Sequence, residues 1–260
     1  MKKPSVTLEN YNQVYDFYAH YRSPWLAYQI GHRAMAAVYR PDVHFAPGAQ
    51  DVISGHFQSG TRLILASNHV NNQDQYIVAA MAQREKVLQP MRGNTFIPAK
   101  ESLFQNPLLR LGVDFMGAIP TFRQKDVSGV ESDDETAKAK QSLQRSAASR
   151  LLDVSIQRII SGDHMAIFPE GTRNTVDVTQ VQQVKRGIGT IVEGLRGVAC
   201  AIVPAGIFYG QGDDFDKRRP TVYVGHPQEG SFLQNPSLLP NIQAALQQSL
   251  DQAITIRSTT

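Results

Sequence analysis

The sequence predicts an α/β fold, in which a mostly parallel central sheet is flanked by helices and preceded by an N-terminal aromatic helical segment. Short apolar runs alternate along the chain with longer segments of helical periodicity. This alternation is typical of a largely parallel sheet that helices cover on both faces. The length of 260 residues, with 42% hydrophobic and 19% charged side chains, suits a globular chain with one large core.

The first element is an aromatic segment at residues 10–39, which Pro24 is expected to divide into two helices. Its aromatic side chains follow a helical stripe: Tyr11, Tyr15, Tyr18, Tyr21, Trp25 and Tyr28. The stripe could pack on the main domain, lie at a membrane headgroup boundary, or do both, because Tyr and Trp combine apolar rings with polar tips. We therefore expect an N-terminal amphipathic helical segment at residues 1–41 and an α/β domain at residues 42–260.

The remaining elements follow from apolar runs and helical periodicity. The expected strands are residues 62–67, 95–99, 113–120, 165–168, 199–203 and 220–225. The expected helices are residues 75–91, 102–111, 139–160, 183–195 and 240–254. Gly112 is expected to end the second of these helices. The polar and acidic residues 124–137 are expected to form an exposed insertion.

Charge and cysteine content exclude some classes of protein. The net charge of +3 is too small to indicate nucleic-acid binding by itself. Residues 84–125 carry seven Lys or Arg against three Asp or Glu, so they could meet phosphates or form a solvated surface. The single cysteine, Cys200, excludes an internal disulfide and a cysteine-cluster metal site, and its apolar run predicts burial. A cytoplasmic setting is the default expectation.

The sequence shows no signal peptide, because Met1 and two lysines are followed by polar residues rather than by an apolar core. No segment approaches the ~18 consecutive apolar residues of a transmembrane helix. Any membrane contact is therefore expected to be peripheral.

A first polar cluster, Asn68 to Asp74, follows the strand predicted at residues 62–67. His69 and Asp74 are five residues apart, which is not a same-face spacing on a helix, but a turn could bring them together. Asp74 would then hold one ring nitrogen of His69, and the other nitrogen could accept a proton. The alternative is a structural histidine beside a helix N-cap aspartate.

A second cluster, residues 168–174, follows the strand predicted at residues 165–168. Gly171 allows the backbone to turn closely around a ligand. Arg173 can bind a phosphate or carboxylate with two hydrogen bonds, and Glu170 could orient Arg173 or bind a substrate hydroxyl. Taken singly, these residues also fit an ordinary turn glycine and a surface ion pair.

Further cations follow other predicted strands. Lys100 follows residues 95–99, and Arg123 follows a strand that includes Gly117. Each cation alone could be an ordinary surface side chain. Because the carboxyl ends of parallel strands meet at one edge of a sheet, we expect them to gather near His69 in one crevice.

The ordered motifs resemble those of the glycerolipid acyltransferases of the lysophosphatidate acyltransferase type. The matching positions are Asn68, His69, Asp74, Gly117, Arg123, residues 168–173, Ile202, Val203 and Pro204. They span residues 68–204. Pro120 and Thr121 depart from the bulky apolar residues usual in the family, and the acidic insertion after Arg123 is longer than usual.

The resemblance implies direct transfer of a fatty acyl group from acyl-CoA or acyl carrier protein to a lysophospholipid hydroxyl. The expected acceptor is 1-acylglycerol-3-phosphate, which would give phosphatidic acid in phospholipid biosynthesis. His69 is then the general base and Asp74 its orienting partner. The substrate-binding set that the resemblance implies is Asn68, Lys100, Gly117, Arg123, Glu170, Gly171, Thr172, Arg173 and Pro204. Backbone N–H groups near Gly171 are candidate oxyanion donors, and no metal or other cofactor is implied.

Other interpretations of the motifs stay open. The acceptor could be glycerol 3-phosphate, another lysophospholipid or a glycolipid. A thioesterase could use His69 and Asp74 to activate water, although water needs no cationic clamp. A third alternative is a non-catalytic protein that binds lipid surfaces. The absence of a Gly-x-Ser-x-Gly sequence agrees with direct transfer.

Overall fold

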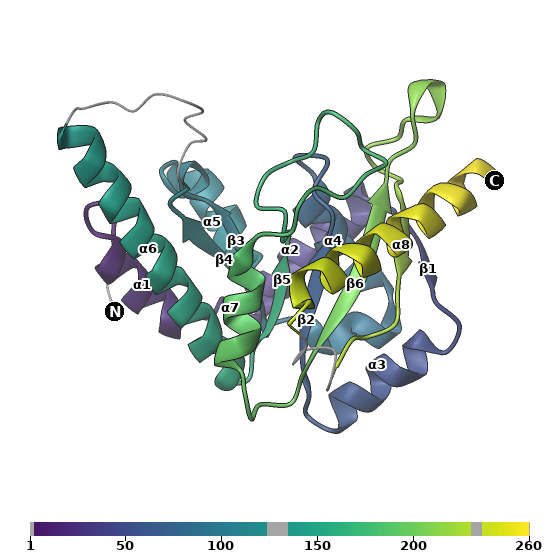
Figure 1. The fold of residues 1–260 in the computed structure, drawn as a ribbon, viewed down its shortest axis with the longest axis horizontal. Helices are drawn as coiled ribbons and strands as arrows, with labels where there is room; N and C mark the ends of the chain where they lie inside the picture. The colour runs from purple at the N-terminus through teal and green to yellow at the C-terminus, as the bar shows by residue number, and fades with distance from the viewer. Residues whose placement is uncertain (1–2, 124–134, 230–235, 260) are drawn as a thin grey trace.

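The computed structural model of the chain describes residues 3–123, 135–229 and 236–259. The described residues contain a seven-stranded sheet in the order β1-β7-β6-β2-β5-β3-β4 (Figure 1). The strands are β1 Asp42–Phe45, β2 Arg62–Ser67, β3 Thr95–Lys100, β4 Ala118–Thr121, β5 His164–Ile167, β6 Cys200–Phe208 and β7 Thr221–Val224.

Five neighbouring strands of the sheet, β6, β2, β5, β3 and β4, run parallel to one another. β7 runs antiparallel to β6, and β1 runs parallel to β7. The five parallel strands therefore end at the same edge, which we call the carboxyl edge and define by the last residue of each strand. Those residues are Ser67, Lys100, Thr121, Ile167 and Phe208. The predicted mostly parallel α/β fold is confirmed.

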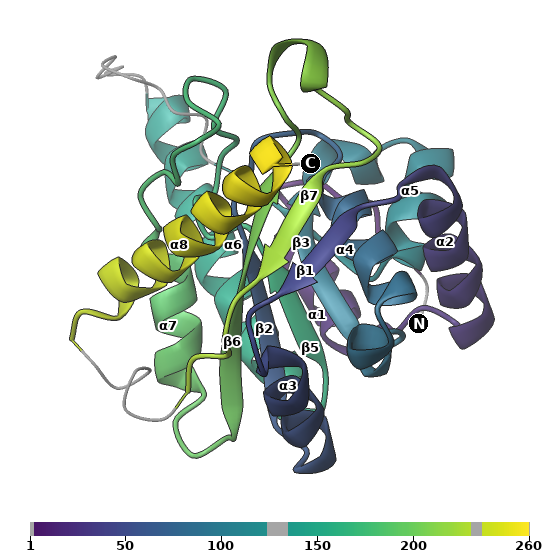
Figure 2. The ribbon, with the colours of Figure 1, turned by 90° about the vertical axis from the view of Figure 1, so that its right-hand side faces the viewer.

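Helices cover both faces of the sheet. The α-helices are α1 Tyr11–His20, α2 Trp25–Val38, α3 Ala49–Gln58, α4 Asp74–Arg84, α5 Pro107–Phe115, α6 Glu135–Ile160, α7 Arg186–Gly194 and α8 Leu238–Thr259. The 3₁₀ segments are η1 Lys86–Met91, η2 Glu101–Phe104 and η3 Gly212–Asp214. Figures 1 and 2 show α6, α7 and α8 on one face and α2 and α4 on the other. None of the helices in the described ranges has both the length and the apolar character needed to span a bilayer.

The C-terminal helix α8 lies directly on β6. At Gly206, a Cβ atom would lie only 2.3 Å from the backbone nitrogen of Leu250. Glycine is therefore needed for this close approach of helix and strand. The buried side chains of β2, β5 and β6 form the centre of the hydrophobic core beneath α8.

The aromatic N-terminal segment forms two helices, and Pro24 stands at the N-cap of the second, as predicted. Tyr15 and Tyr18 are fully buried and belong to the same hydrophobic core as the sheet. Their rings meet Phe122 and Phe104 at centroid distances of 5.9 and 5.7 Å. This part of the stripe therefore packs on the main domain, and the division at residue 42 stays a prediction.

The region between β3 and β4 differs from the prediction. Residues 113–120 were expected to form a strand, but α5 continues to Phe115 and β4 begins at Ala118. Gly112 lies inside α5 rather than after it. The Asn106 side chain accepts hydrogen bonds from the N–H groups of Leu108 and Leu109, so the helix begins later than expected. Because α5 starts five residues later than predicted, its nine residues reach Phe115, inside the range predicted as a strand.

Other elements differ at their ends. The segment predicted as one helix at residues 75–91 is α4 followed by η1, and β6 extends five residues beyond the predicted end at Val203. Two elements, β1 and α3, lie in residues 42–61, for which the sequence predicted none. Of the predicted insertion at residues 124–137, residues 124–134 lie outside the described residues and residues 135–137 begin α6.

Candidate active site

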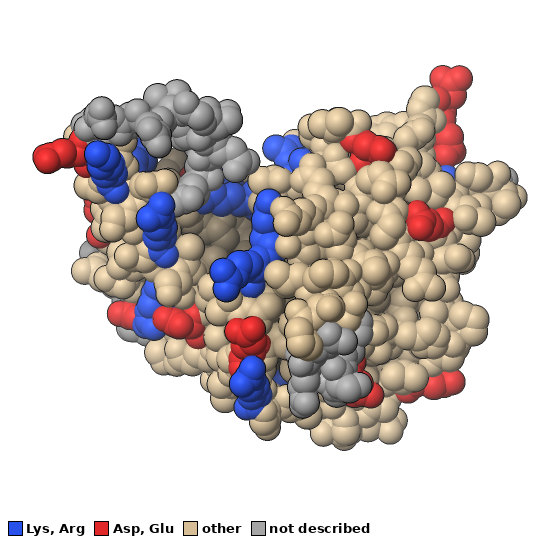
Figure 3. Space-filling model, viewed as in Figure 1, with Lys and Arg blue, Asp and Glu red and all other residues tan. Residues whose placement is uncertain are grey.

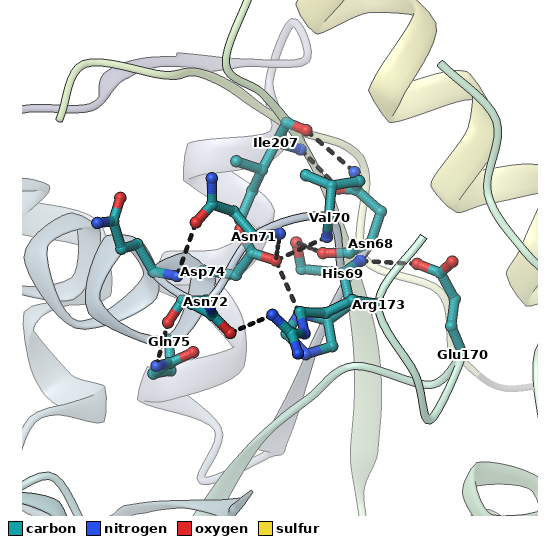
Figure 4. Close-up of polar contacts among 12 residues, drawn as sticks. Asn68, His69, Val70, Asn71, Asn72, Asp74, Gln75, Glu170, Arg173 and Ile207 are labelled. Atoms are coloured by element: carbon teal, nitrogen blue, oxygen red, sulfur yellow. Dashed lines mark hydrogen bonds and ion pairs between the residues drawn. The ribbon is translucent and has the colours of Figure 1, made fainter. Parts of the chain in front are cut away.

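Polar side chains from the exits of β2 and β5 meet beside β6 at the carboxyl edge (Figure 4). The turn of residues 68–74 joins β2 to α4, and the loop of residues 168–185 joins β5 to α7. Tyr209 follows the end of β6. Because β6, β2 and β5 are adjacent in the sheet, these three segments form one continuous site.

The 68–74 turn folds the Asp74 carboxylate back onto His69. The His69 Nδ1 atom lies 2.7 Å from Asp74 Oδ2, which also accepts the backbone N–H groups of Val70 and Asn71 at 2.8 and 2.9 Å. Asp74 is fully buried, and the N-cap of α4 is Gln73 rather than Asp74. The geometry therefore matches the paired arrangement and not the N-cap alternative.

The Asp74 contact decides which ring nitrogen of His69 carries the proton. An ionised carboxylate only accepts hydrogen bonds, so Nδ1 is the donor and Nε2 keeps its lone pair. The Phe168 ring stacks on the imidazole at a centroid distance of 4.4 Å and an interplanar angle of 14°. Asp74 and Phe168 together fix the plane of the ring.

Glu170 lies behind His69 and is fully buried. Its Oε1 accepts the backbone N–H of His69 at 2.7 Å, and its Oε2 accepts the N–H of Gln182 at 2.9 Å. Burial raises the pKa of the Glu170 carboxyl to about 7, whereas these two N–H bonds lower it. The turn after β5 directs the side chain inward onto these N–H groups, so Glu170 does not orient Arg173 in the structure, and its contact with a substrate hydroxyl stays a prediction.

Three other predicted binding residues form hydrogen bonds with the backbone of neighbouring segments. The Asn68 amide is buried, donates to the Ile207 carbonyl at 3.0 Å and accepts the Ile207 N–H at 2.7 Å, which extends the pairing of β2 with β6. Pro204 is buried within β6 and accepts the Gly225 N–H at 2.8 Å. Gly117 precedes β4 at the opposite edge of the sheet.

Gly117 permits a close contact between strands far from His69. Its φ angle is 74°, and an added Cβ would lie 2.3 Å from the Thr95 carbonyl oxygen. The Gly117 carbonyl accepts the Ile97 N–H at 3.2 Å. Its place in the motif therefore reflects the packing of β4 on β3, and the structure does not bring it to the crevice.

The loop of residues 168–185 is held against His69. Asn174 donates its backbone N–H to the His69 carbonyl at 2.7 Å. Gly171 has a φ angle of 74° and donates its N–H to the Phe168 carbonyl at 3.0 Å, so this amide closes a turn, and the oxyanion donors near Gly171 stay a prediction. The Thr172 hydroxyl donates to the Gln182 side chain at 3.2 Å.

The predicted cations are exposed at the same edge. Arg173 donates to the Asn72 side chain in the 68–74 turn. Neighbouring protein atoms partly desolvate the exposed Arg123 guanidinium and lower its pKa. Glu101 raises this pKa and the positive charge of Arg173 lowers it, so the two arginines lie within electrostatic range. Lys100 pairs in register with Thr121, two residues before Arg123. Figure 3 shows Lys and Arg side chains along a hollow between α6 and the segment leading into α7.

Three residues outside the predicted set contribute to this site. The buried Tyr209 hydroxyl donates to Asp74 Oδ1 at 2.6 Å. Asn72 accepts the hydrogen bond from Arg173, and Phe168 stacks on His69. Tyr209 could have been noticed as the residue that follows the apolar run of β6. Asn72 and Phe168 both lie inside the motifs, but their positions alone do not indicate their contacts.

The arrangement suits the removal of a proton from an anionic substrate. Nε2 of His69 is a proton acceptor oriented by a buried carboxylate, and two guanidinium groups lie at the same edge. A positioned base of this kind accelerates proton transfer, and arginines bind phosphates through charge-assisted hydrogen bonds.

Comparisons with known proteins agree with this site. A family model described as Acyltransferase matches residues 50–208, which include all four motifs. A search of curated proteins found no match. Since the matched region covers more than half of the chain and contains the His69–Asp74 pair, the chain belongs to the acyltransferase family of glycerolipid enzymes.

Proposed function

We propose that this acyltransferase moves a fatty acyl group from acyl-CoA or acyl carrier protein to a lysophospholipid hydroxyl. The acceptor we favour is 1-acylglycerol-3-phosphate, which gives phosphatidic acid in phospholipid biosynthesis. The observation that carries the proposal is the 2.7 Å contact of His69 Nδ1 with Asp74 at an edge that also bears Arg123 and Arg173.

The proposed reaction is a direct transfer. Nε2 of His69 takes the proton of the acceptor hydroxyl as the oxygen attacks the thioester carbonyl, and Asp74 stabilises the resulting imidazolium. The tetrahedral intermediate then expels the thiolate, which takes the proton from Nε2. The products are the ester and the free thiol, and His69 returns to its starting state.

An acyl-cysteine intermediate does not fit the position of Cys200. This residue is buried in the first position of β6, at the opposite edge of the sheet from His69. Burial also raises the pKa of its thiol, which lowers the fraction of reactive thiolate. Both observations support transfer without a covalent enzyme intermediate.

The cations would hold the acceptor phosphate. Arg123 and Arg173 are exposed, and the positive charge of Arg173 is near enough to lower the pKa of Arg123. A phosphate between them would satisfy both guanidinium groups and bring the acceptor hydroxyl to His69. Lys100, at the end of the neighbouring strand β3, would add a third positive charge.

The test is an acceptor panel. Purified enzyme with one acyl-CoA would be supplied in turn with lysophosphatidate, glycerol 3-phosphate, another lysophospholipid and a glycolipid, while thiol release and lipid product are followed. We expect the highest kcat/KM with lysophosphatidate. Equal thiol release without any acceptor would indicate a thioesterase instead, and no turnover with any acceptor or with acyl carrier protein would refute the proposal.

We further propose that the enzyme works at the cytoplasmic surface of a membrane, through an apolar face on α2 and α5. The two helices meet where an added Cβ on Gly31 would lie 3.6 Å from Phe115 Cβ. The large exposed apolar side chains of this face are Trp25, Leu26, Ile30, Leu108, Leu109 and Leu111. Residues 23–39 contain no Asp or Glu, so no negative side chain of this segment would repel anionic lipid.

Vesicle co-sedimentation tests this surface without removing helices that belong to the core. Leu108 is 81% exposed and Trp25 is 68% exposed, so replacing both by Ser should preserve the fold and weaken binding to anionic vesicles. Val176 is 93% exposed on the 168–185 loop, and Val176→Ser is the matched control. Equal binding by the double variant and the control would exclude this face.

A further inference from the structure

A short loop follows β6 and runs from Tyr209 to Arg219, before β7. Tyr209 is 3% exposed, and its hydroxyl lies 2.6 Å from Asp74 Oδ1. This contact joins residues 135 positions apart. It connects the aspartate of the first motif to a segment that lies beyond the last one.

The two oxygens of the Asp74 carboxylate have different environments. Oδ2 takes N–H donors from the segment of residues 69–71, all within the turn that contains Asp74 itself. Among the described residues, the hydrogen-bond donor recorded for Oδ1 is Tyr209. The donors of residues 69–71 hold Oδ2 in place. The Tyr209 hydroxyl holds Oδ1, so the carboxylate cannot rotate about Oδ2.

The tyrosine stays a donor near neutral pH. Burial raises the pKa of its phenol, and the negative charge of Asp74 raises it further. Tyr39, whose ring is stacked on Tyr76 of α4, also raises the pKa of Tyr209. The Tyr209 hydroxyl therefore keeps its proton and donates a hydrogen bond to the carboxylate.

The loop that carries Tyr209 is closed on itself. Asp216 donates its N–H to the Tyr209 carbonyl at 2.8 Å, and the Phe215 ring lies 6.1 Å from the Tyr209 ring. Gly210 has a φ angle of 79°, and an added Cβ would lie 2.3 Å from the Asp214 carbonyl oxygen. The loop is therefore a compact turn with a defined geometry.

Helix α8 fastens this turn through one arginine. Arg257 Nε lies 2.7 Å from the Asp214 carboxylate, and its two terminal nitrogens donate to the carbonyls of Asp214 and Arg219 at 2.7 Å. The Arg40 N–H also donates to the Arg218 carbonyl at 2.7 Å. The path from α8 to His69 is therefore continuous: Arg257, the turn, Tyr209 and Asp74.

We infer that Tyr209 is a positioning residue for the His69–Asp74 pair, and that the 209–219 turn, held by Arg257, sets its place. The kinetic part of this inference rests on the proposed acyl transfer. Without the hydroxyl, Oδ1 of Asp74 would be buried and would lose its donor, so the carboxylate would turn away from the line of the His69 N–H. The base would then be less well oriented, while both substrate sites would be unchanged.

The first test is Tyr209→Phe, which removes only the hydroxyl. We expect kcat to fall on the order of tenfold, as for other residues that orient a functional histidine, with KM unchanged for donor and acceptor. Tyr223→Phe is the matched control, since Tyr223 is a partly buried tyrosine on neighbouring β7. A rise in KM with unchanged kcat, or equal kcat in Tyr209→Phe and the control, would overturn the inference.

Arg257→Gln tests the outer end of the path. It keeps α8 but removes the charged contact with Asp214, so kcat should fall in the same direction by a smaller factor, roughly threefold. In the Tyr209→Phe background the same change should have little further effect, because both act through Asp74. Fully independent effects of the two changes would refute the path.

A substrate-free measurement separates this inference from the proposed function. In ¹⁵N-labelled protein, the His69 Nδ1–H proton should give a downfield signal that Tyr209→Phe shifts or broadens and Tyr223→Phe leaves in place. An unchanged signal in Tyr209→Phe, in protein shown to be folded by circular dichroism, would refute the positioning role. If the wild type transferred no acyl group to any acceptor, the proposed function would fail and this signal would still decide the inference.

Discussion

The crevice at the carboxyl edge has two halves that are built differently. In the base half, formed by the 68–74 turn, the 168–185 loop and Tyr209, the polar side chains of Asp74 and Glu170 are fully buried and hydrogen-bonded. In the cation half, formed by Lys100, Arg123 and Arg173, the side chains are exposed. The fold therefore holds His69 in place through buried hydrogen bonds, whereas the cations lie on the surface with fewer fixed contacts.

The difference follows from the physical cost of each arrangement. A buried carboxylate must have hydrogen-bond partners, so the base half is either complete or strongly destabilised. Exposed ion pairs gain little in water, since solvent screens them and holding long side chains costs entropy. A phosphate that binds two arginines at once gains more binding free energy than one exposed ion pair, because it forms charge-assisted hydrogen bonds with both. The four predictions below test this contrast in order of decreasing effect.

The largest effect is expected in the base half. His69→Ala should lower kcat on the order of a thousandfold, because no other group would take the proton of the acceptor hydroxyl. KM should change little, since the cation half is intact. Steady-state kinetics would measure both, with His44→Ala as the control, because His44 is a histidine on β1 that pairs with Asp42. A loss confined to KM would mean that His69 binds substrate and is not the base.

The next effect belongs to the cation half. Arg173→Gln should raise the acceptor KM about thirtyfold, which corresponds to the loss of about 2 kcal/mol from a charge-assisted contact with phosphate. Arg173→Lys should recover only part of this, because lysine cannot present the planar pair of donors. Initial rates over an acceptor titration would measure the change. Arg196→Gln, in the turn that follows α7, should match the wild type. A similar rise there would indicate nonspecific electrostatics.

A stability effect is expected from Glu170 in the base half. Burial raises the pKa of its carboxyl in the folded protein to about 7, above the ordinary value of 4.5. Between these values the folded state binds more protons than the unfolded state, so the contribution of this carboxyl to the unfolding free energy falls as pH rises from 4.5 to 7. Glu170→Gln does not titrate, so the melting temperature of the wild type relative to this variant should fall over the same range. A difference that is constant with pH would show that the carboxyl is ionised throughout.

The smallest effect is expected at the contact between the two halves. Asn72 accepts a hydrogen bond from Arg173, so Asn72→Ala should release the guanidinium and change the acceptor KM by roughly threefold, with kcat unchanged. Kinetics of the double variant Asn72→Ala/Arg173→Gln provide the check. If Asn72 acts only through Arg173, its effect should disappear in that background. A persistent effect would mean that Asn72 contacts substrate itself.

The general fold could be predicted because it depends on local pattern. Apolar runs alternating with helical periodicity indicated the parallel sheet, and the position of the motifs after the runs indicated the edge. The antiparallel direction of β7 could not be predicted, since a short apolar run has the same pattern in a parallel and in an antiparallel strand.

The site was predictable only where the motif itself contains both partners. The His69–Asp74 pair lies within one turn and could be proposed from its spacing. The Tyr209–Asp74 and Asn68–Ile207 contacts join residues more than 130 positions apart, so they depend on the register of β2 against β6, which the sequence pattern does not specify. Glu170 illustrates a further limit of sequence-based prediction. Its charge suggested a contact with Arg173 or with a substrate hydroxyl, and only the fold shows that its side chain points inward to backbone N–H groups.

Helix α8 completes a site whose motifs all precede it. Gln243 and Gln247 of this helix accept the N–H groups of Val184 and Val181 in the loop beside His69, and Arg257 holds the turn that carries Tyr209. During synthesis, a nascent chain released only as far as β7 would contain every motif and still lack these supports. Acyl transfer is therefore expected to begin only after α8 has emerged from the ribosome and docked.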